Sequence, residues 1–163
     1  MILLIVNDIV VEADTMKAEI PWNQYHIREV YTAYSADDAR AVIEKKPIDI
    51  LLCDIEMPGE NGLSLIQWMQ EQQYDIDCIL LTCHADFSYA KKGLSLGCQD
   101  YILLPAKYED IGQSVLKVSL QRVQRQKKQQ LQVYGKKWLR NQSDTIIPSD
   151  TTIHKTSAEI ADA

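Results

Sequence analysis

The chain has 163 residues, 46% of them hydrophobic and 25% charged, which suits one soluble domain with an appendage. No apolar run approaches the roughly 18 residues that a membrane span needs. The first six residues, Met-Ile-Leu-Leu-Ile-Val, carry neither a basic leader nor a small-residue cleavage site, so we expect no signal peptide. The composition therefore excludes an integral membrane protein and predicts a cytoplasmic one.

The net charge of −6 conceals two different segments. Residues 1–110 contain 8 basic and 19 acidic side chains, a net charge of −11, whereas residues 111–143 contain 8 basic side chains and no acidic one. The last 20 residues return to −3. Such an asymmetry predicts an acidic domain followed by a basic segment of different character.

Strand and helix patterns alternate along residues 1–105. Apolar or β-branched runs predict strands, and runs with helical spacing predict helices between them. Ser35 is placed to cap the second helix, with Asp38 at the capping-box position. In chain order the expected strands are 1–6, 26–34, 48–54, 76–82 and 101–104, and the expected helices begin near Val10, Ser35, Asn61, Phe87 and Tyr108. Five strand–helix repeats at these spacings predict a doubly wound α/β domain.

Asp54 ends the most apolar of these strands. The run from Ile50 to Cys53 leads into the carboxylate, and the Pro58-Gly59 turn follows shortly after. A continuous apolar run is typical of a strand buried on both faces of a parallel sheet. Because ligands of such sheets bind beyond the carboxyl ends of the strands, Asp54 is expected at a functional edge.

Other polar residues follow the neighbouring strands at the same edge. Asn7 and Asp8 come after the first strand, and Thr82 ends the fourth. Two carboxylates from adjacent strands suit Mg²⁺, which prefers oxygen ligands. A carboxylate beside such a metal ion can attack a phosphoryl group and form an acyl phosphate. The Thr82 hydroxyl could then donate to a phosphoryl oxygen.

With these residues in register, residues 1–120 resemble a response-regulator receiver domain of two-component signalling. The resemblance is carried by Ile5-Val6-Asn7-Asp8, by Asp54 with Met57-Pro58-Gly59 and Asn61-Gly62, by Thr82, and by Gly97 through Pro105. It implies a flavodoxin-like five-stranded parallel sheet of order 2-1-3-4-5 with an extended C-terminal helix. It further implies Asp54 as the phosphoacceptor, and Thr82 and Tyr101 as switch residues. Mg²⁺ would be bound by Asp8, Asp54 and the backbone carbonyl of Glu56.

The chain departs from the family pattern at three positions. Asn7 replaces one residue of the acidic pair, and Ile9 occupies the usual third acidic position. Leu104 replaces the lysine before the proline, which normally holds the phosphoryl group with a charge-assisted bond of roughly 1.5–3 kcal/mol. We therefore expect weak Mg²⁺ binding and a less stable phosphorylated state. Lys107, just beyond Pro105, is the nearest cation in sequence.

The four cysteines, Cys53, Cys78, Cys83 and Cys98, form no C-x-x-C pair and lie among apolar neighbours. This pattern favours buried, reduced thiols over a metal site or disulfides. Neither a catalytic Ser/Cys-His-Asp arrangement nor a glycine-rich phosphate loop is evident. Because position 56 is glutamate, Asp54 does not begin the D-x-D pair of a haloacid-dehalogenase-type phosphatase. His84 is expected to be a solvated loop residue.

From Tyr108 to about Arg140 the pattern predicts one extended helix. Within it, a weak heptad pattern places residues at alternating spacings of four and three along one side of the helix. The residues in this pattern are Leu116, Leu120, Val123, Lys127, Gln130 and Tyr134, and the pattern becomes polar after Val123. It favours a homodimer through the C-terminal helix, although a solvated basic face or direct nucleic-acid binding would give a similar composition. The expected divisions are a receiver domain over 1–118, a basic helical extension over 119–140 and a flexible polar tail over 141–163.

Two functions remain open. In the first, a sensor histidine kinase phosphorylates Asp54, and Thr82 and Tyr101 relay the change to the last helix. In the second, a degenerate receiver acts as a phosphorylation-independent dimerisation or docking module, as Asn7 and Leu104 would favour. Neither makes the chain an enzyme beyond self-catalysed phosphoryl transfer and hydrolysis. The stretch from Asp86 to Lys92 also resembles regulators with an AraC-type output domain. DNA contact is then expected only through an output domain absent from this chain.

Overall fold

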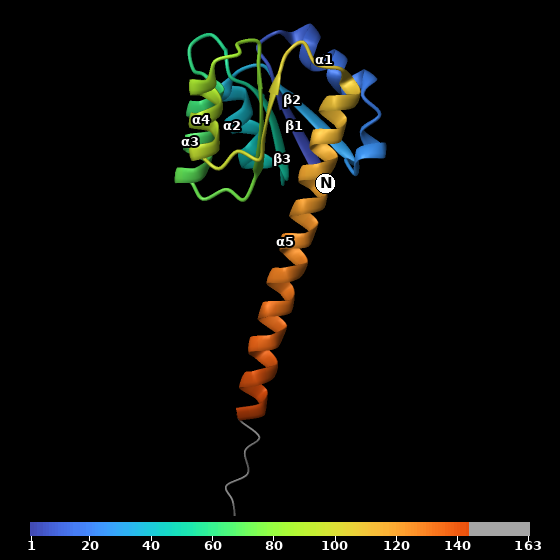
Figure 1. The fold of residues 1–163 in the computed structure, drawn as a ribbon, viewed down its shortest axis with the longest axis vertical. Helices are drawn as coiled ribbons and strands as arrows, with labels where there is room; N and C mark the ends of the chain where they lie inside the picture. The colour runs from blue at the N-terminus through green and yellow to red at the C-terminus, as the bar shows by residue number, and fades with distance from the viewer. Residues whose placement is uncertain (144–163) are drawn as a thin grey trace, which may run out of the picture. The chain divides into compact units, whose positions relative to one another are not determined.

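The computed structural model describes residues 1–143, and Met1–Gln124 form one compact unit. Its sheet has five parallel strands in the order β2-β1-β3-β4-β5, as the resemblance implied (Figure 1). The strands are β1 (Ile2–Val6), β2 (Glu29–Ala33), β3 (Ile50–Asp54), β4 (Asp77–Thr82) and β5 (Asp100–Leu103). The helices are α1 (Val10–Glu19), α2 (Ala36–Lys45), α3 (Gly62–Glu71), α4 (Phe87–Ser95) and α5 (Tyr108–Ser143), with a short 3-10 helix, η1, over Trp22–Tyr25.

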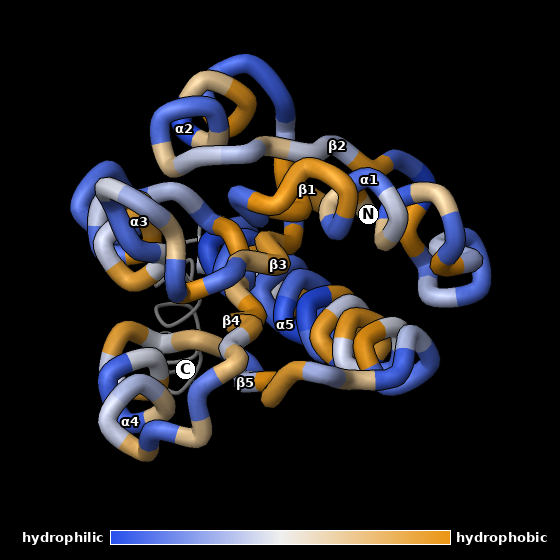
Figure 2. The backbone as a smooth tube through the Cα atoms, turned by 90° about the horizontal axis from the view of Figure 1, so that it is seen from above, coloured by the Kyte–Doolittle hydropathy of each residue, from blue (hydrophilic) through white to orange (hydrophobic). Residues whose placement is uncertain are grey.

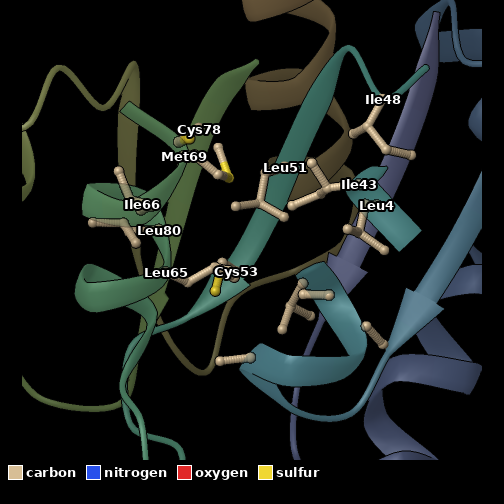
Figure 3. Packing of buried hydrophobic residues seen from close by; sticks show 14 of the residues in the cluster. Leu4, Ile43, Ile48, Leu51, Cys53, Leu65, Ile66, Met69, Cys78 and Leu80 are labelled. Carbon is tan, nitrogen blue, oxygen red and sulfur yellow. The ribbon is translucent and has the colours of Figure 1, made fainter. Parts of the chain in front are cut away.

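Two hydrophobic layers cover the two faces of the sheet. On one face, side chains of β1, β3 and β4 pack against α2 and α3, as Figure 3 shows for Leu4, Leu51, Ile43 and Ile66. On the other face, α1, η1 and α5 cover the alternate side chains of the same strands. The central strands are therefore apolar on both sides, and the hydrophobic colour concentrates on them in Figure 2. This burial explains the continuous apolar runs in the sequence.

The second strand is shorter than the sequence indicated. It begins at Glu29, because η1 occupies Trp22–Tyr25 and His26 follows it in a left-handed conformation with φ of 65°. Trp22 and Tyr25 are buried beneath the sheet. The aromatic residues that favoured the strand are Tyr31, which lies in β2, and Tyr34, which directly follows it.

The fifth strand covers Asp100–Leu103, so Leu104 lies just beyond it. The N–H of Leu104 still donates to the carbonyl of Thr82 at 2.7 Å, which keeps the chain beside β4 for one more residue. The Leu104–Pro105 peptide bond is cis.

Helix α5 continues to Ser143, three residues past the expected end near Arg140, so the described part of the expected tail, 141–143, is helical. The rest of the expected tail, 144–163, lies outside the described residues. Over 125–143 every side chain is exposed, including those of Leu131, Tyr134 and Trp138. In the described part of the chain, no helix combines the length and apolarity needed to cross a bilayer.

Candidate functional site

Asp54 lies at the carboxyl end of the central strand β3 and is only 7% exposed. One of its carboxylate oxygens, Oδ1, accepts the backbone N–H of Glu56 at 3.2 Å. This local bond turns the chain away from the sheet as an Asx-turn does. The carboxyl group is consequently held at the start of the loop that leads to α3.

The loop returns to the end of β3 because a glycine stands at its far end. The N–H of Gly62 donates to the carbonyl of Ile55 at 3.0 Å, and a Cβ at Gly62 would lie 2.3 Å from the carbonyl oxygen of Asp54. Asn61 then caps α3 by accepting the N–H of Ser64 at 3.0 Å. The Asn-Gly pair therefore fixes the loop against the strand that carries Asp54.

Acidic groups surround the Asp54 side chain. Burial of its carboxyl group, together with the negative charges of Glu56 and Asp8, raises the pKa of Asp54 to about 7. Asp8 follows β1, the neighbouring strand, as the sequence predicted. Because several acidic groups lie close together here, the site is expected to attract a cation.

Thr82 ends β4 and is fully buried. Its hydroxyl donates to Oε1 of Glu56 at 2.6 Å and accepts the backbone N–H of His84 at 3.1 Å. The sequence suggested only a backbone role for Glu56, but its side chain reaches the hydroxyl at the sheet edge. The signal in the sequence for this role was an acidic residue between two apolar ones, Ile55 and Met57, two positions after Asp54.

Tyr101 is half-buried on β5, and its hydroxyl donates to the carbonyl of His84 at 3.1 Å. The backbone of His84 is thus bound on one side by Tyr101 and on the other by Thr82. The His84 side chain is exposed, as expected. The loop between β4 and α4 therefore connects the two predicted switch residues.

Asn7 is fully buried, and both ends of its amide are used within the chain. Its Oδ1 accepts the N–H of Ile9 at 2.9 Å, and its Nδ2 donates to Oε2 of Glu12 at 3.0 Å. Glu12, on the first turn of α1, is a second acidic side chain that the sequence did not single out. Ile9 is 49% exposed and contributes no carboxylate.

Leu104 is an apolar residue at the position where the resemblance implies a lysine. It lines a pocket of about 320 Å³ together with Asn7, Glu12 and Cys83. Lys107 is exposed. None of the ion pairs formed by residues 1–143 includes Asp8, Glu12, Asp54 or Glu56. The negative charge of the site is therefore not balanced by a side chain of the described region.

The oxygen atoms at this edge suit a hard divalent cation. Asp8 and Asp54 offer carboxylates from adjacent strands, while no three His, Cys, Asp or Glu side chains of residues 1–143 form a metal-binding cluster by themselves. Mg²⁺ usually takes one or two protein carboxylates and keeps several waters, so a small number of protein ligands is sufficient.

All four cysteines are free, and Cys53, Cys78 and Cys98 are buried as predicted. The expectation was wrong for Cys83, which is exposed on the loop after β4. Partial desolvation and the negative charges of Asp54 and Glu56 raise the pKa of the Cys83 thiol. Cys83 therefore stays a neutral thiol at the rim of the site.

Comparison with protein families identifies the arrangement. The model of the response regulator receiver domain matches residues 3–116, a span that reaches from β1 to β5 and includes Asn7, Asp8, Asp54 and Thr82. The chain belongs to the response-regulator receiver family.

Relatives of this receiver domain are regulators from staphylococci. An uncharacterized response regulatory protein of Staphylococcus epidermidis is 30% identical over 123 residues, covering 74% of this chain and 47% of the relative. The transcriptional regulatory protein HptR of Staphylococcus aureus is 29% identical over 109 residues, covering 67% of this chain and 42% of the relative. The chain thus spans less than half the length of these relatives.

Among solved structures, the receiver domain of AraT from Geobacillus stearothermophilus is similar. It aligns with a TM-score of 0.69 and 27% identity over 77% of this chain and 97% of that domain. A CheY-like receiver domain from Methanospirillum hungatei aligns with a TM-score of 0.66 at 24% identity, which supports the fold alone. The predicted fold class is therefore confirmed.

Proposed function

We propose that this receiver domain is a phosphorylation switch of a two-component system, with Asp54 as the phosphoacceptor for a sensor histidine kinase. The observation that carries the proposal is the position of the buried Asp54 carboxyl group at the sheet edge, beside the acidic Asp8 and the Thr82 hydroxyl. In the transfer, an oxygen of the Asp54 carboxylate forms a bond to phosphorus as the P–N bond of phosphohistidine breaks. The leaving imidazole nitrogen takes up a proton.

In this proposal Mg²⁺ binds weakly, and the carboxylates of Asp8 and Asp54 and the backbone carbonyl of Glu56 would hold it. Such an ion would neutralise the charge that builds up between the carboxylate and the phosphoryl group, and would favour ionised Asp54. Asn7 supplies no charge, and its amide already bonds within the chain. The chain's own part is therefore to present the nucleophile on a rigid strand end and to hold Thr82 beside it.

The output would pass through the loop after β4. A phosphoryl oxygen that takes the Thr82 hydroxyl would change the bonding of His84, whose carbonyl holds the Tyr101 hydroxyl. We propose that release of the Tyr101 hydroxyl from this carbonyl alters the surface of β5. This change at β5 would then be passed on to α5.

Dimerisation through the C-terminal helix is supported by exposed apolar side chains over 125–143. Leu131, Tyr134 and Trp138 are 62% to 72% exposed and follow one another at spacings of 3 and 4 residues. This is the seam spacing of a coiled coil. HptR is a transcriptional regulatory protein, which supports transcriptional control through an output domain. The resemblance of residues 86–92 favours an output domain of AraC type.

The experiment is labelling of the protein with Mg²⁺ and a small phosphodonor such as acetyl phosphate, followed by intact mass. One phosphoryl group should be added, and Asp54→Asn should abolish the addition. Asp110→Asn, which removes an exposed carboxylate on α5, is the matched control and should be labelled normally. No adduct at millimolar donor on folded protein would exclude the switch.

The second candidate is a degenerate receiver whose docking or dimerisation does not depend on phosphate. The observation in its favour is the apolar Leu104 beside the uncharged Asn7. Absence of an adduct together with an unchanged dimer in sedimentation would support this candidate.

A further inference from the structure

The Thr82 hydroxyl is already bonded to a carboxylate of the chain itself. It donates to Oε1 of Glu56 over 2.6 Å, a distance at the short end of hydrogen bonds to ionised oxygen. The N–H of His84 donates to the same hydroxyl oxygen at 3.1 Å. The hydroxyl also lies 3.4 Å from the carbonyl oxygen of His84, but the much shorter distance makes Glu56 its main acceptor.

Glu56 is directed into the site although its charge is poorly compensated there. Its other oxygen, Oε2, is buried and has no hydrogen-bond partner. The negative charge of Glu56 acts on Asp54, and no ion pair of residues 1–143 includes Glu56. Leaving a buried carboxylate oxygen unpaired is costly, so the short bond from Thr82 helps to retain the Glu56 side chain beside Asp54.

The loop fixes where this side chain can go. Its two neighbours, Ile55 and Met57, are buried, and its own backbone N–H is bonded to Oδ1 of Asp54. With the backbone anchored on both sides, only rotation of the Glu56 side chain can move the carboxylate. Glu56 therefore has two available positions, inward on Thr82 or outward in solvent.

We propose that the Glu56 side chain is a built-in competitor for the Thr82 hydroxyl, which must leave before that hydroxyl can bind a phosphoryl oxygen on Asp54. The inference rests on the proposed function. One hydroxyl hydrogen cannot serve two acceptors at full strength, and a phosphoryl group would also be repelled by the nearby carboxylate. Glu56 thus holds the unphosphorylated arrangement and weakens the phosphorylated one.

The test is the affinity for beryllofluoride, a phosphoryl mimic, measured at saturating Mg²⁺ by the ¹⁹F signal of the bound species. Glu56→Ala should bind about tenfold more tightly than the wild type, as expected when a charge-assisted competitor is removed. Glu56→Gln, which keeps an acceptor but loses the charge, should lie between them. Glu44→Gln changes the net charge equally on the exposed side of α2 and should bind like the wild type.

A double-mutant cycle with Thr82→Val separates competition for the hydroxyl from simple charge repulsion. The gain from Glu56→Ala should be much smaller in the Thr82→Val background, where only the charge repulsion remains. An equal gain in both backgrounds would overturn the proposal, because Glu56 would then act through its charge alone.

The outcomes also distinguish this inference from the proposed function. Binding by the wild type with no gain in Glu56→Ala would overturn the competition and leave the phosphoacceptor intact. Binding only in Glu56→Ala would support the competition strongly. No binding in either protein, with both folded by circular dichroism, would remove the proposed function and the inference with it.

Discussion

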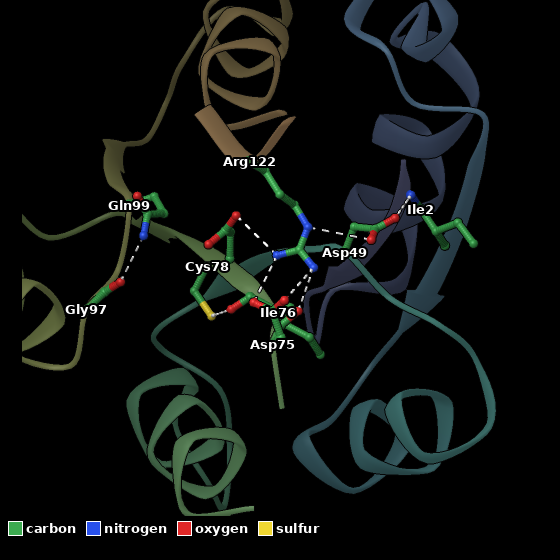
Figure 4. Close-up of polar contacts among 9 residues, drawn as sticks. Ile2, Asp49, Asp75, Ile76, Cys78, Gly97, Gln99 and Arg122 are labelled. Atoms are coloured by element: carbon green, nitrogen blue, oxygen red, sulfur yellow. Dashed lines mark hydrogen bonds and ion pairs between the residues drawn. The ribbon is translucent and has the colours of Figure 1, made fainter. Parts of the chain in front are cut away.

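A guanidinium nitrogen of Arg122 on α5 lies 3.3 Å from a carboxylate oxygen of Asp77, and both residues are at least 94% buried. The same side chain also contacts Asp75 and Asp49, as Figure 4 shows. Asp77 begins β4, whereas Thr82 ends it, so this cluster lies at the sheet edge opposite the candidate site. Helix α5 is thereby fixed to the strand that ends at Thr82.

Removing the cation should therefore destabilise the domain. Arg122→Met would leave Asp77 with a buried charge, and breaking such a pair typically costs about 3 kcal/mol of unfolding free energy. Lys117→Met, an exposed position on the same helix, should cost less than about 0.5 kcal/mol. Urea unfolding of both variants measures the difference. Equal losses would show that the cluster contributes little.

Gly62→Ala should disturb the end of β3. The added Cβ would meet the backbone oxygen of Asp54 at 2.3 Å, and backbone cannot move aside cheaply. We expect a loss of about 2 kcal/mol in unfolding free energy and weaker beryllofluoride binding. Gly135→Ala is the contrasting case, since nothing lies within 4 Å of its Cβ position in α5. That substitution should increase helical circular dichroism, because alanine favours helix by about 1 kcal/mol.

Leu104→Lys should strengthen binding of the phosphoryl mimic. Leu104 lines a pocket together with Asn7 and Glu12, so a lysine at position 104 would place a positive charge beside the acidic site. A charge-assisted bond to the bound fluoride should tighten Mg²⁺-dependent beryllofluoride binding about tenfold. Leu103→Lys adds the same charge at an exposed neighbouring position. If the two lysines raise the affinity equally, general charge and not the position is responsible.

The metal-free protein should become less stable as the pH rises. The pKa of Asp54 is about 7 in the folded chain against an ordinary value of 3.8, so between these values the folded state binds more protons than the unfolded state. Unfolding free energy then falls with increasing pH across this interval. Asp54→Asn removes the effect, and its advantage over the wild type should grow by about 3 kcal/mol between pH 4.5 and pH 8. Urea unfolding in EDTA tests this, and a pH-independent difference would contradict the burial of Asp54.

Much of the fold could be predicted because most local sequence patterns were compatible with only one type of secondary structure. Apolar runs of β1, β3 and β4 are long enough to be buried on both sides, and the Asn61 cap marks the start of α3 without reference to the rest of the chain. The start of β2 was missed for the opposite reason. Ile27 has a strand-favouring side chain, but its N–H donates to the carbonyl of Trp22 at 3.1 Å and its side chain packs with η1 on the sheet.

The order of residues alone indicates which polar groups follow which strand, and it therefore predicts that Asp8, Asp54 and Thr82 meet at one edge of the sheet. Parallel connectivity carries that information, because the carboxyl ends of all strands open on the same side. The pairing of the side chains at that edge became visible only in the folded chain. The Nδ2 of Asn7 donates to Glu12, and the Thr82 hydroxyl donates to Glu56, which is 26 residues away in the sequence. These bonds depend on side-chain rotation and, for Glu56, on packing between distant segments, which no local pattern records.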